Sequence, residues 1–188
     1  MNETSIYNKA KNIKAVAFDG DGVIFTGRVF ISPEKGEVLK ERSHIDGQGI
    51  SFLRAIGLSI IFVSGEKSGF IEKLTEKLNS LPSVKKGEWA PIKTFVDFQA
   101  KERVDIIDEW LKGLNISLQE CAFMGDDLAD YEILKKVGLA AAPAQAEEII
   151  KKFVHYVAPR RGGDGAIRDF CDLILKAKGI DVTTLSLR

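Results

Sequence analysis

Histidine and cysteine are scarce in this sequence, and their scarcity excludes several kinds of chemistry. The 188 residues include two histidines, His44 and His155, and two cysteines, Cys121 and Cys171. The histidines lie far from either cysteine, so neither Cys2His2 zinc spacing nor a two-histidine metalloprotease motif is present. Each cysteine stands in apolar surroundings, which is typical of a small buried thiol rather than of a disulfide or a nucleophile. Catalysis would therefore rest on carboxylates, hydroxyls and amines, and we expect a reduced, cytoplasmic setting.

The sequence also lacks an excess of charge and a long hydrophobic run. Lys+Arg and Asp+Glu both number 27, which gives a formal net charge of zero. Nucleic-acid binders usually carry a basic patch, so we expect no nucleic-acid partner. No uninterrupted apolar run approaches the roughly 20 residues of a membrane span, so we expect no membrane segment. The length suits a single domain over residues 1–188.

Short β-branched apolar runs alternate with longer amphipathic segments along the chain. A short continuous apolar run is typical of a buried strand, and apolar residues that recur every three or four positions are typical of a helix. The alternation predicts a Rossmann-like α/β fold, in which a parallel sheet carries helices on both faces. The expected strands are 13–18, 58–63 and 120–124, and the expected helices are 48–56, 69–78, 101–114 and 128–137.

Two segments interrupt this alternation. Residues 28–40 contain two apolar stretches around Ser32-Pro33-Glu34-Lys35-Gly36, which predicts an inserted β-hairpin. The hairpin is too small to be a cap domain, and its apolar residues need cover, which a neighbouring subunit would provide. Residues 80–93 predict an irregular loop because they contain two prolines and a glycine, and residues 177–188 are expected to form a C-terminal tail.

Polar residues follow three of the expected strands, as Asp19-Gly20-Asp21-Gly22, Ser64-Gly65-Glu66-Lys67 and Gly125-Asp126-Asp127. Ligands of α/β sheets bind beyond the carboxyl ends of the strands, so these residues are candidates for one site. Aspartates crowded there repel one another unless a cation neutralises them, and oxygen ligands without imidazole or thiolate favour Mg²⁺. A carboxylate held against this ion can attack phosphorus, while a second acid protonates the leaving oxygen.

Each motif alone also has an ordinary structural interpretation. Asp-x-Asp-Gly occurs in turns and in calcium loops, although the twelfth position of such a loop would be Phe30 rather than a glutamate. Ser64-Gly65 suits a turn with an N-cap, and Gly125-Asp126-Asp127 suits a loop that caps the next helix. Their occurrence together, in chain order and after strands, favours the catalytic interpretation.

The three motifs resemble those of the haloacid dehalogenase superfamily of phosphohydrolases. The segment 18–23, Phe-Asp-Gly-Asp-Gly-Val, is similar to the first motif of that superfamily. Val63-Ser64-Gly65 is similar to the second motif, and Gly125-Asp126-Asp127 with Asp130 is similar to the fourth. The resemblance therefore covers three separate strand ends of one expected sheet.

This resemblance implies a role for each matching residue. Asp19 would be the nucleophile, which forms an aspartyl-phosphate, and Asp21 would be the general acid and then the general base. Ser64 and Gly65 would bind the phosphoryl group. The resemblance further implies Mg²⁺ as the cofactor, with a metal site formed by Asp19, by the carbonyl of Asp21, and by Asp126, with Asp127 supporting the metal shell.

Over residues 13–175 the chain resembles more closely the small branch that has no cap domain. Members of this branch dephosphorylate 2-keto-3-deoxy sugar acids such as 3-deoxy-D-manno-octulosonate 8-phosphate and 2-keto-3-deoxy-nononate or N-acylneuraminate 9-phosphate. The match includes the hairpin and the segments 46–50 and 161–168. The resemblance implies a homotetramer in which hairpins associate and a neighbouring subunit helps to close the active site.

Several residues depart from the pattern of this branch. In the third motif only a lysine before a helix is kept, for which we choose Lys101 as the catalytic and phosphate-binding cation, with Lys93 a weaker candidate. Glu66 and Ile45 stand where octulosonate phosphatases commonly have arginines. An arginine pairs with a carboxylate, whereas a glutamate accepts hydrogen bonds from hydroxyls, so Glu66 favours a nine-carbon substrate. The alternative for Glu66 is a solvated acid that caps the next helix.

Three further basic residues are candidates for contact with an anionic substrate. Lys77 lies on the same helical face as Lys73, and Arg161 and Arg168 flank a glycine-rich segment that in this branch lies near a neighbour's site. Arg161 also suits a solvated turn, and Arg168 also suits an ion pair within a helix. The alternatives to a sugar acid phosphatase are a non-catalytic subunit with the same fold and a phosphatase for another small phosphate.

Overall fold

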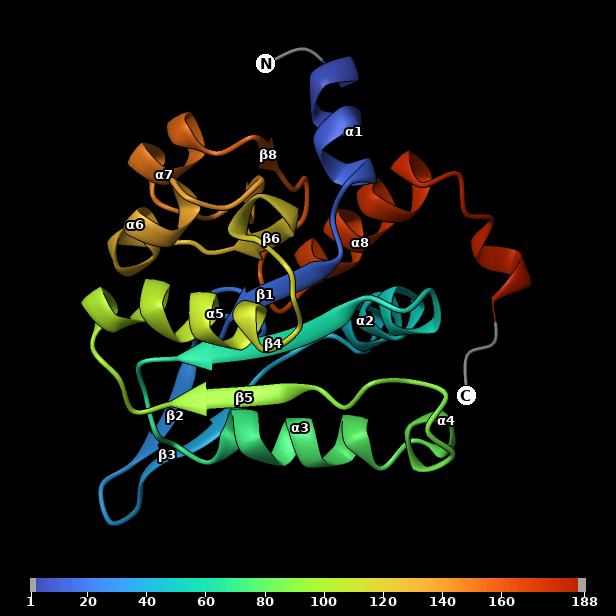
Figure 1. Ribbon diagram of the computed structural model, residues 1–188. Coiled ribbons are helices and arrows are strands. Elements are labelled where there is room, and N and C mark those ends of the chain that lie inside the picture. Colours follow the sequence, from blue (N-terminus) through green and yellow to red (C-terminus); the bar gives the residue numbers. More distant parts are fainter. Residues whose placement is uncertain (1–2, 186–188) are drawn as a thin grey trace.

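The structure, a computed structural model that describes residues 3–185, is built around a six-stranded parallel sheet (Figure 1). Its strands are β1 (Ala15–Asp19), β4 (Ser59–Ser64), β5 (Lys93–Val96), β6 (Cys121–Met124), β7 (Leu139–Ala142) and β8 (Tyr156–Val157). They lie in the order β5-β4-β1-β6-β7-β8, so β1 is flanked by β4 and β6. The predicted α/β fold is confirmed.

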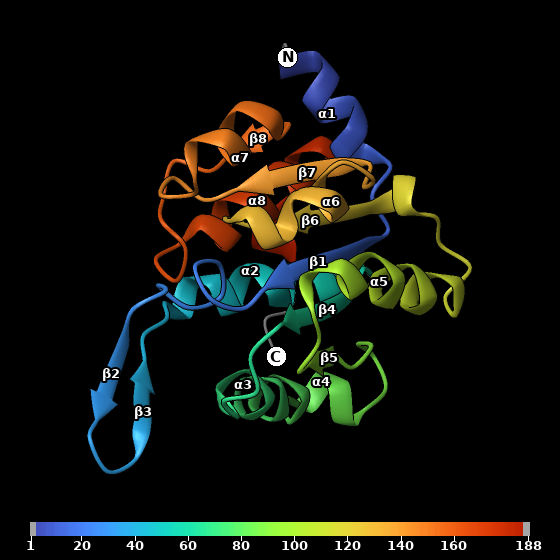
Figure 2. The same cartoon turned by 90° about the vertical axis from the view of Figure 1, so that its left-hand side faces the viewer.

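Helices lie on both faces of this sheet (Figures 1 and 2). They are α1 (Glu3–Lys11), α2 (His44–Ala55), α3 (Phe70–Asn79), α4 (Pro82–Lys85), α5 (Arg103–Lys112), α6 (Tyr131–Leu134), α7 (Glu148–Phe153) and α8 (Ala166–Ala177). Short 3-10 turns are η1 (Ala100–Glu102), η2 (Leu118–Glu120), η3 (Leu128–Asp130) and η4 (Val182–Thr184). α1, α2, α3 and α8 contribute to one hydrophobic core, and α5, α6 and α7 contribute to the other.

Alternate residues of the central strand enter these two cores. Val16 and Phe18 belong to the core of α2 and α8, while Ala15 and Ala17 belong to the core of α5. Successive side chains of a strand point to opposite faces of the sheet, and here both faces are covered. A continuous apolar run, rather than an alternating one, is therefore the pattern that this strand requires.

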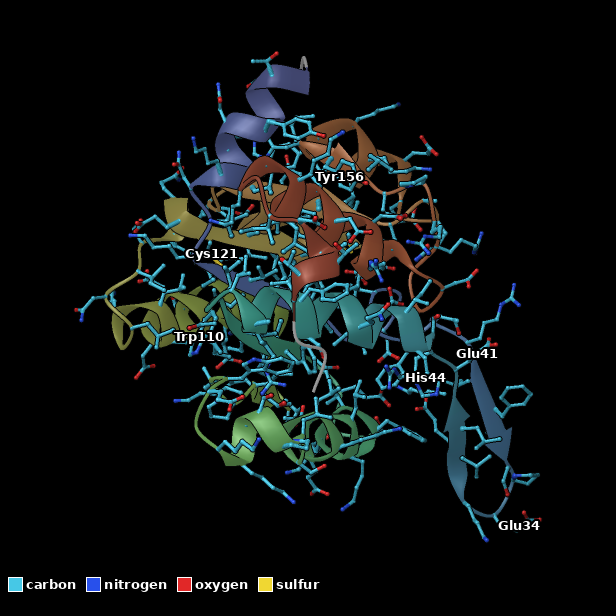
Figure 3. All side chains as sticks on the ribbon, turned by 90° about the vertical axis from the view of Figure 1, so that its right-hand side faces the viewer. Glu34, Glu41, His44, Trp110, Cys121 and Tyr156 are labelled. Carbon is cyan, nitrogen blue, oxygen red and sulfur yellow. The ribbon has the colours of Figure 1, made fainter. Side chains whose placement is uncertain are left out.

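The predicted hairpin, β2 (Val29–Ser32) and β3 (Gly36–Lys40), projects away from the sheet (Figure 2). Glu34 lies at its tip and Glu41 at its base (Figure 3). Phe30, Ile31 and Leu39 are 61%, 70% and 60% exposed. Large apolar side chains gathered on an isolated two-stranded ribbon are typical of surfaces that bind another molecule, and cover by a neighbouring subunit stays a prediction.

The structure differs from the sequence expectations in several elements. β5, β7 and β8 are additional strands of two to four residues, and β7 reads Leu-Ala-Ala-Ala, which lacks the β-branched residues that signal a strand. The helix expected at 128–137 is divided into η3 and α6, and the loop expected at 80–93 contains α4. Within the expected tail, α8 ends at Ala177 and η4 follows, whereas residues 186–188 lie outside the described residues.

Two expectations about composition are met in the part of the chain that the structure describes. Cys121 and Cys171 are free, buried thiols. Among residues 3–185, no helix is both long enough and apolar enough to span a membrane.

Candidate active site

Three aspartates meet at the carboxyl edge of the sheet. Asp19 is the last residue of β1, and Asp126 follows β6, the parallel strand beside it. Asp130 ends η3, four residues after Asp126. One carboxyl oxygen from each of these residues lies within 4.8 Å of the others. The structure thus brings together Asp19 and Asp126, as the sequence predicts, and adds Asp130, which is fully buried.

The loop after β6 fixes Asp130 and gives Asp127 a different role. Asp130 Oδ2 accepts hydrogen bonds from the backbone N–H of Asp126 at 2.8 Å and of Asp127 at 3.4 Å. Asp127 Oδ1 accepts a hydrogen bond from the N–H of Ala129 at 2.8 Å and so caps η3. Asp127 is not part of the three-aspartate group, and its support of a metal shell stays a prediction. The sequence comparison includes Asp130 in the fourth motif without a role, and the Asp-x-x-Asp spacing of a capping box is the sequence signal for its position in this loop.

Arg103, the first residue of α5, provides a buried positive charge beside these aspartates. Its Nη1 donates a hydrogen bond to Asp19 Oδ1 at 2.6 Å and another to Asp130 Oδ1. The side chain is 6% exposed, and its Nε is buried with no hydrogen-bond partner among residues 3–185. Because an unpaired buried donor costs free energy, this atom is suited to receive an oxygen of an anionic ligand.

The sequence led us to expect Lys101 at this position, and the structure places Lys101 elsewhere. Lys101 is exposed on η1, two residues before Arg103. Residues two apart on a helical turn do not share a face, so only one of these two cations can face Asp19. Lys93, the weaker candidate, is the first residue of β5 and therefore lies away from the carboxyl ends of the parallel strands, where the aspartates are. Arg103 therefore takes the place that we expected Lys101 to fill.

Burial and mutual repulsion change the acidity of this group. Burial, followed by the charge of Asp130, raises the pKa of Asp19 well above its ordinary value. Burial and then the charge of Asp19 raise the pKa of Asp126 to about 7. For Arg103, burial lowers the pKa, but the charges of Asp19 and Asp130 outweigh this and the pKa is raised. Burial is thus the main cause of the raised pKa values of the two aspartates, and repulsion between the carboxyl groups adds to it.

The residues present fit a divalent cation. Asp19, Asp126 and Asp130 offer oxygen ligands in a largely buried position, without histidine or cysteine, and this is the donor set that Mg²⁺ prefers. A cation there would relieve the repulsion that raises the pKa values of the aspartates. Gly22 allows Asp126 to lie close to the loop after β1, since a Cβ on Gly22, at φ +83°, would overlap Asp126 Oδ2.

Ser64 and Gly65 lie beside the loop that follows β1. Ser64 is the buried last residue of β4, and a Cβ on Gly20 would lie 3.0 Å from its Oγ. This contact places the hydroxyl against the chain between Asp19 and Asp21. Ser64 Oγ also accepts a hydrogen bond from the N–H of Glu66 at 3.2 Å, as the turn interpretation requires. The phosphate-binding role of Ser64 and Gly65 stays a prediction.

A second charged cluster joins the hairpin to the same loop. Lys40, the last residue of β3, donates hydrogen bonds to Asp21 Oδ1 at 2.8 Å, to Asp21 Oδ2 at 2.9 Å and to Glu66 Oε2. Burial raises the pKa of Asp21, and the hydrogen bond from Lys40 offsets this only in part. Burial lowers the pKa of Lys40, but hydrogen bonds to Asp21 and Glu66 outweigh it and the pKa is raised. Lys40 was not among the residues expected at the site, because its contacts depend on how the hairpin folds over the sheet edge.

Among the described residues, the three basic residues expected to contact substrate form no hydrogen bond or ion pair with the site aspartates. Lys77 is exposed on α3 and lines a cavity of about 330 Å³ whose lining includes none of the site aspartates. Arg161 is exposed and lines another cavity, of about 420 Å³, at the base of the hairpin. Arg168 donates to Asp172 Oδ1 at 2.8 Å and to Gln48 Oε1 at 2.6 Å, so the alternative of a helix ion pair is realised.

Comparison with known proteins gives a consistent family relationship. Residues 62–168 match the haloacid dehalogenase-like hydrolase family. The chain is 31% identical over 176 residues to 3-deoxy-D-manno-octulosonate 8-phosphate phosphatase of Salmonella typhi, covering 94% of this chain and 86% of that protein. The structure of the Yersinia pestis phosphatase of the same name matches with a TM-score of 0.85 and 27% identity, covering 98% of this chain and 91% of that one. The Moraxella catarrhalis phosphatase, solved in complex with a magnesium ion, a phosphate ion and a KDO molecule, matches with a TM-score of 0.81 and 28% identity, covering 95% and 94%.

Proposed function

Since this chain belongs to the haloacid dehalogenase-like hydrolases and its relatives are phosphatases, we propose that it hydrolyses the terminal phosphate monoester of a 2-keto-3-deoxy sugar acid. The observation that carries this proposal is the buried Asp19 at the end of β1, which faces Asp126, Asp130 and Arg103. The names of the Salmonella and Moraxella relatives support the substrate class. We expect the enzyme to act in the cytoplasm.

The residues of the site divide the reaction between them. Asp19 Oδ attacks phosphorus in line with the leaving oxygen, so an O–P bond forms while the bond to the sugar oxygen breaks. Asp21 donates a proton to that sugar oxygen, and the sugar acid leaves as an alcohol. Asp21 then removes a proton from water, which attacks the aspartyl-phosphate, releases inorganic phosphate and regenerates Asp19. Arg103, through Nε, and Ser64, through Oγ, would hold phosphoryl oxygens, which is supported by the unpaired, buried Nε and by the position of Oγ against Gly20.

Asp19, Asp126 and Asp130 would hold Mg²⁺, with the carbonyl of Asp21 as a further ligand. When bound, this ion would offset the charge that builds up as the phosphoryl group is transferred. The Moraxella relative contains a magnesium ion, which supports this choice of metal.

Glu66 bears on which sugar acid is preferred. The relatives are named for an eight-carbon substrate, whereas a glutamate at position 66 suits hydrogen bonding to the extra hydroxyls of a nine-carbon acid. The carboxylate of Glu66 is 42% exposed and shares Lys40 with Asp21, so it lies beside the proposed general acid. This position favours a direct contact with the substrate over the alternative of a solvated helix cap.

We also propose that the protein forms a homotetramer through its hairpins. The exposed side chains of Phe30, Ile31 and Leu39 support this association, because such a surface is rarely left in contact with water. Arg161, at the base of the hairpin, would then be available to the site of a neighbouring subunit.

Phosphate release is the direct test of the proposed function. The wild-type protein should release phosphate from p-nitrophenyl phosphate and from octulosonate 8-phosphate or nonulosonate 9-phosphate in the presence of Mg²⁺, and much less with EDTA. Asp19→Asn should abolish turnover while thermal unfolding stays cooperative. Absence of phosphate release from every substrate would favour a non-catalytic subunit instead.

A substrate panel with Glu66→Arg tests the preference. We expect the wild type to have the higher kcat/KM on the nine-carbon acid, and the variant to shift toward the eight-carbon acid. A wild type that strongly prefers the eight-carbon acid would show that Glu66 does not select the longer substrate.

A further inference from the structure

Lys40 is buried although the strand that carries it is not. The other residues of β3 are exposed, and the preceding Leu39 is 60% exposed, whereas the side chain of Lys40 is 2% exposed. Strand alternation turns Lys40 toward the body of the protein as Leu39 turns outward. Burying an ammonium group costs free energy unless negatively charged groups pair with it, so the residues around Lys40 indicate its role.

Carboxylates from three separate segments surround the Lys40 ammonium. Both oxygens of Asp21 accept hydrogen bonds from Nζ, at 2.8 and 2.9 Å, and Glu66 Oε2 accepts another. Glu37, on the same strand, lies 3.4 Å from Nζ. The rings of Phe25 and Phe70 lie 5.9 and 5.7 Å away by their centroids and exclude water from the ammonium. The position of the ammonium is thus fixed by ion pairs with the carboxylates and by cation–π contacts with the two rings.

This arrangement fixes the carboxyl group of Asp21 through both of its oxygens. A bidentate contact with one ammonium restricts both side-chain torsions of Asp21, whose side chain is 37% exposed. Proton transfer to a leaving oxygen requires the acid within hydrogen-bond reach at the moment that the bond breaks. A residue that holds the carboxyl group still therefore contributes to that step without touching the reacting atoms.

We propose that Lys40 is a positioning residue, which the hairpin delivers to the active site to orient Asp21 toward the leaving oxygen and to hold Glu66 beside it. The inference rests on the proposed function, because it takes Asp21 as the acid that protonates the leaving group. It makes the hairpin part of the active site of its own chain, in addition to its role as an association surface. It also predicts that the effect of Lys40 depends on how much the leaving group needs a proton.

Two substrates with different leaving groups test this dependence. A sugar alkoxide needs protonation as it departs, whereas p-nitrophenolate leaves readily without it. The variants are Lys40→Met, Lys40→Arg and the control Lys35→Met, which makes the same change at an exposed position of the same hairpin. kcat/KM should be measured for the sugar acid phosphate and for p-nitrophenyl phosphate, since this ratio reports on the steps through transfer of the phosphoryl group. Thermal unfolding and mass in solution should be compared for all variants.

We expect Lys40→Met to lower kcat/KM by about 10- to 100-fold for the sugar acid phosphate and by less than about 3-fold for p-nitrophenyl phosphate. Lys40→Arg, which keeps a cation able to pair with both oxygens of Asp21, should recover most of the loss, and Lys35→Met should match the wild type. Equal losses on both substrates would overturn the proposal, because they would indicate that Lys40 binds the phosphate or maintains the fold. Unchanged activity on both would also overturn it. If the wild type hydrolyses neither substrate, the proposed function itself fails, which separates the two conclusions.

Discussion

Replacing Arg103 by methionine should remove the cation on which the site depends, while the same change at Lys101 should not. Arg103 Nη1 lies 2.6 Å from Asp19 Oδ1 and also binds Asp130, and its side chain is 6% exposed. At an effective dielectric constant of about 20, one such contact contributes roughly 6 kcal/mol of Coulomb attraction, of which desolvation offsets a large part. The net effect of breaking a buried pair of this kind is about 3–5 kcal/mol of unfolding free energy.

Arg103→Met should also lower the rate of catalysis, in addition to its effect on stability. A preorganised donor that meets charge developing on a phosphoryl group typically contributes about 10²- to 10³-fold in rate, and we expect a loss of at least this size in kcat/KM. Arg103→Lys should be intermediate, because an ammonium keeps the charge but not the planar fork that reaches Asp19 and Asp130 together. Lys101→Met removes the same charge from an exposed position two residues away and should stay within about 2-fold of the wild type.

The assay is phosphate release from p-nitrophenyl phosphate at saturating Mg²⁺, with thermal unfolding of each variant measured in parallel. Activity should be measured well below the unfolding temperature of the least stable variant, so that loss of fold does not contribute. A larger loss in Lys101→Met than in Arg103→Met would refute the assignment of the third-motif cation to Arg103. Activity of Arg103→Met within about 3-fold of the wild type would refute it as well.

Three further predictions follow from the charges and exposed surfaces. Because the folded-state pKa of Asp126 is raised to about 7 from 3.8, the folded state binds more protons than the unfolded state between these pH values. The free energy of unfolding in EDTA should therefore be up to about 4 kcal/mol higher at pH 4 than at pH 8, and Asp126→Asn or added Mg²⁺ should reduce this difference. A free energy of unfolding that does not change with pH would contradict the prediction. Leu39→Glu should weaken association, and an unchanged mass by analytical ultracentrifugation would exclude the hairpin as the contact surface. Arg168→Ala should cost about 1 kcal/mol of stability through the loss of its Asp172 pair, with kcat/KM unchanged; a selective loss of activity would instead support its contact with substrate in a neighbouring subunit.

The parts of the site that the sequence predicts are those fixed by the topology of a parallel sheet. Asp19 and Asp126 each follow an apolar run, and neighbouring parallel strands bring their carboxyl ends together whatever the loops do. Ser64 reaches the same edge for the same reason, because β4 pairs with β1 so that Asp19 lies opposite Val63. The hydrophobic pattern of the strands is enough to predict these positions, because the prediction requires no knowledge of side-chain packing.

Arg103, Asp130 and Lys40 are harder to find because small local details decide which way they face. Lys101 and Arg103 are both cations before the same helix, and only the point at which η1 becomes α5 determines which of them turns inward. Local geometry likewise gives Asp127 and Asp130 different roles. Asp127 caps η3, whereas the side chain of Asp130 accepts hydrogen bonds from the backbone of the loop before η3. Lys40 approaches from a hairpin whose angle to the sheet is set by tertiary contacts, and those contacts leave no periodic signal in the sequence.

The charges at the site predict a dependence of catalysis on the proposed assembly. Asp19, Asp126 and Asp130 carry three carboxyl groups against the single guanidinium of Arg103, so one divalent cation would balance the group, yet a phosphate monoester adds about two further negative charges near neutral pH. Lys40 cannot meet these charges, because Asp21 and Glu66 already engage it. A cation from a neighbouring subunit, such as Arg161, would offset one of these two charges. KM should therefore rise when the protein is diluted below its association range while kcat changes less, and a KM independent of protein concentration across dissociation would show that one chain holds the phosphate unaided.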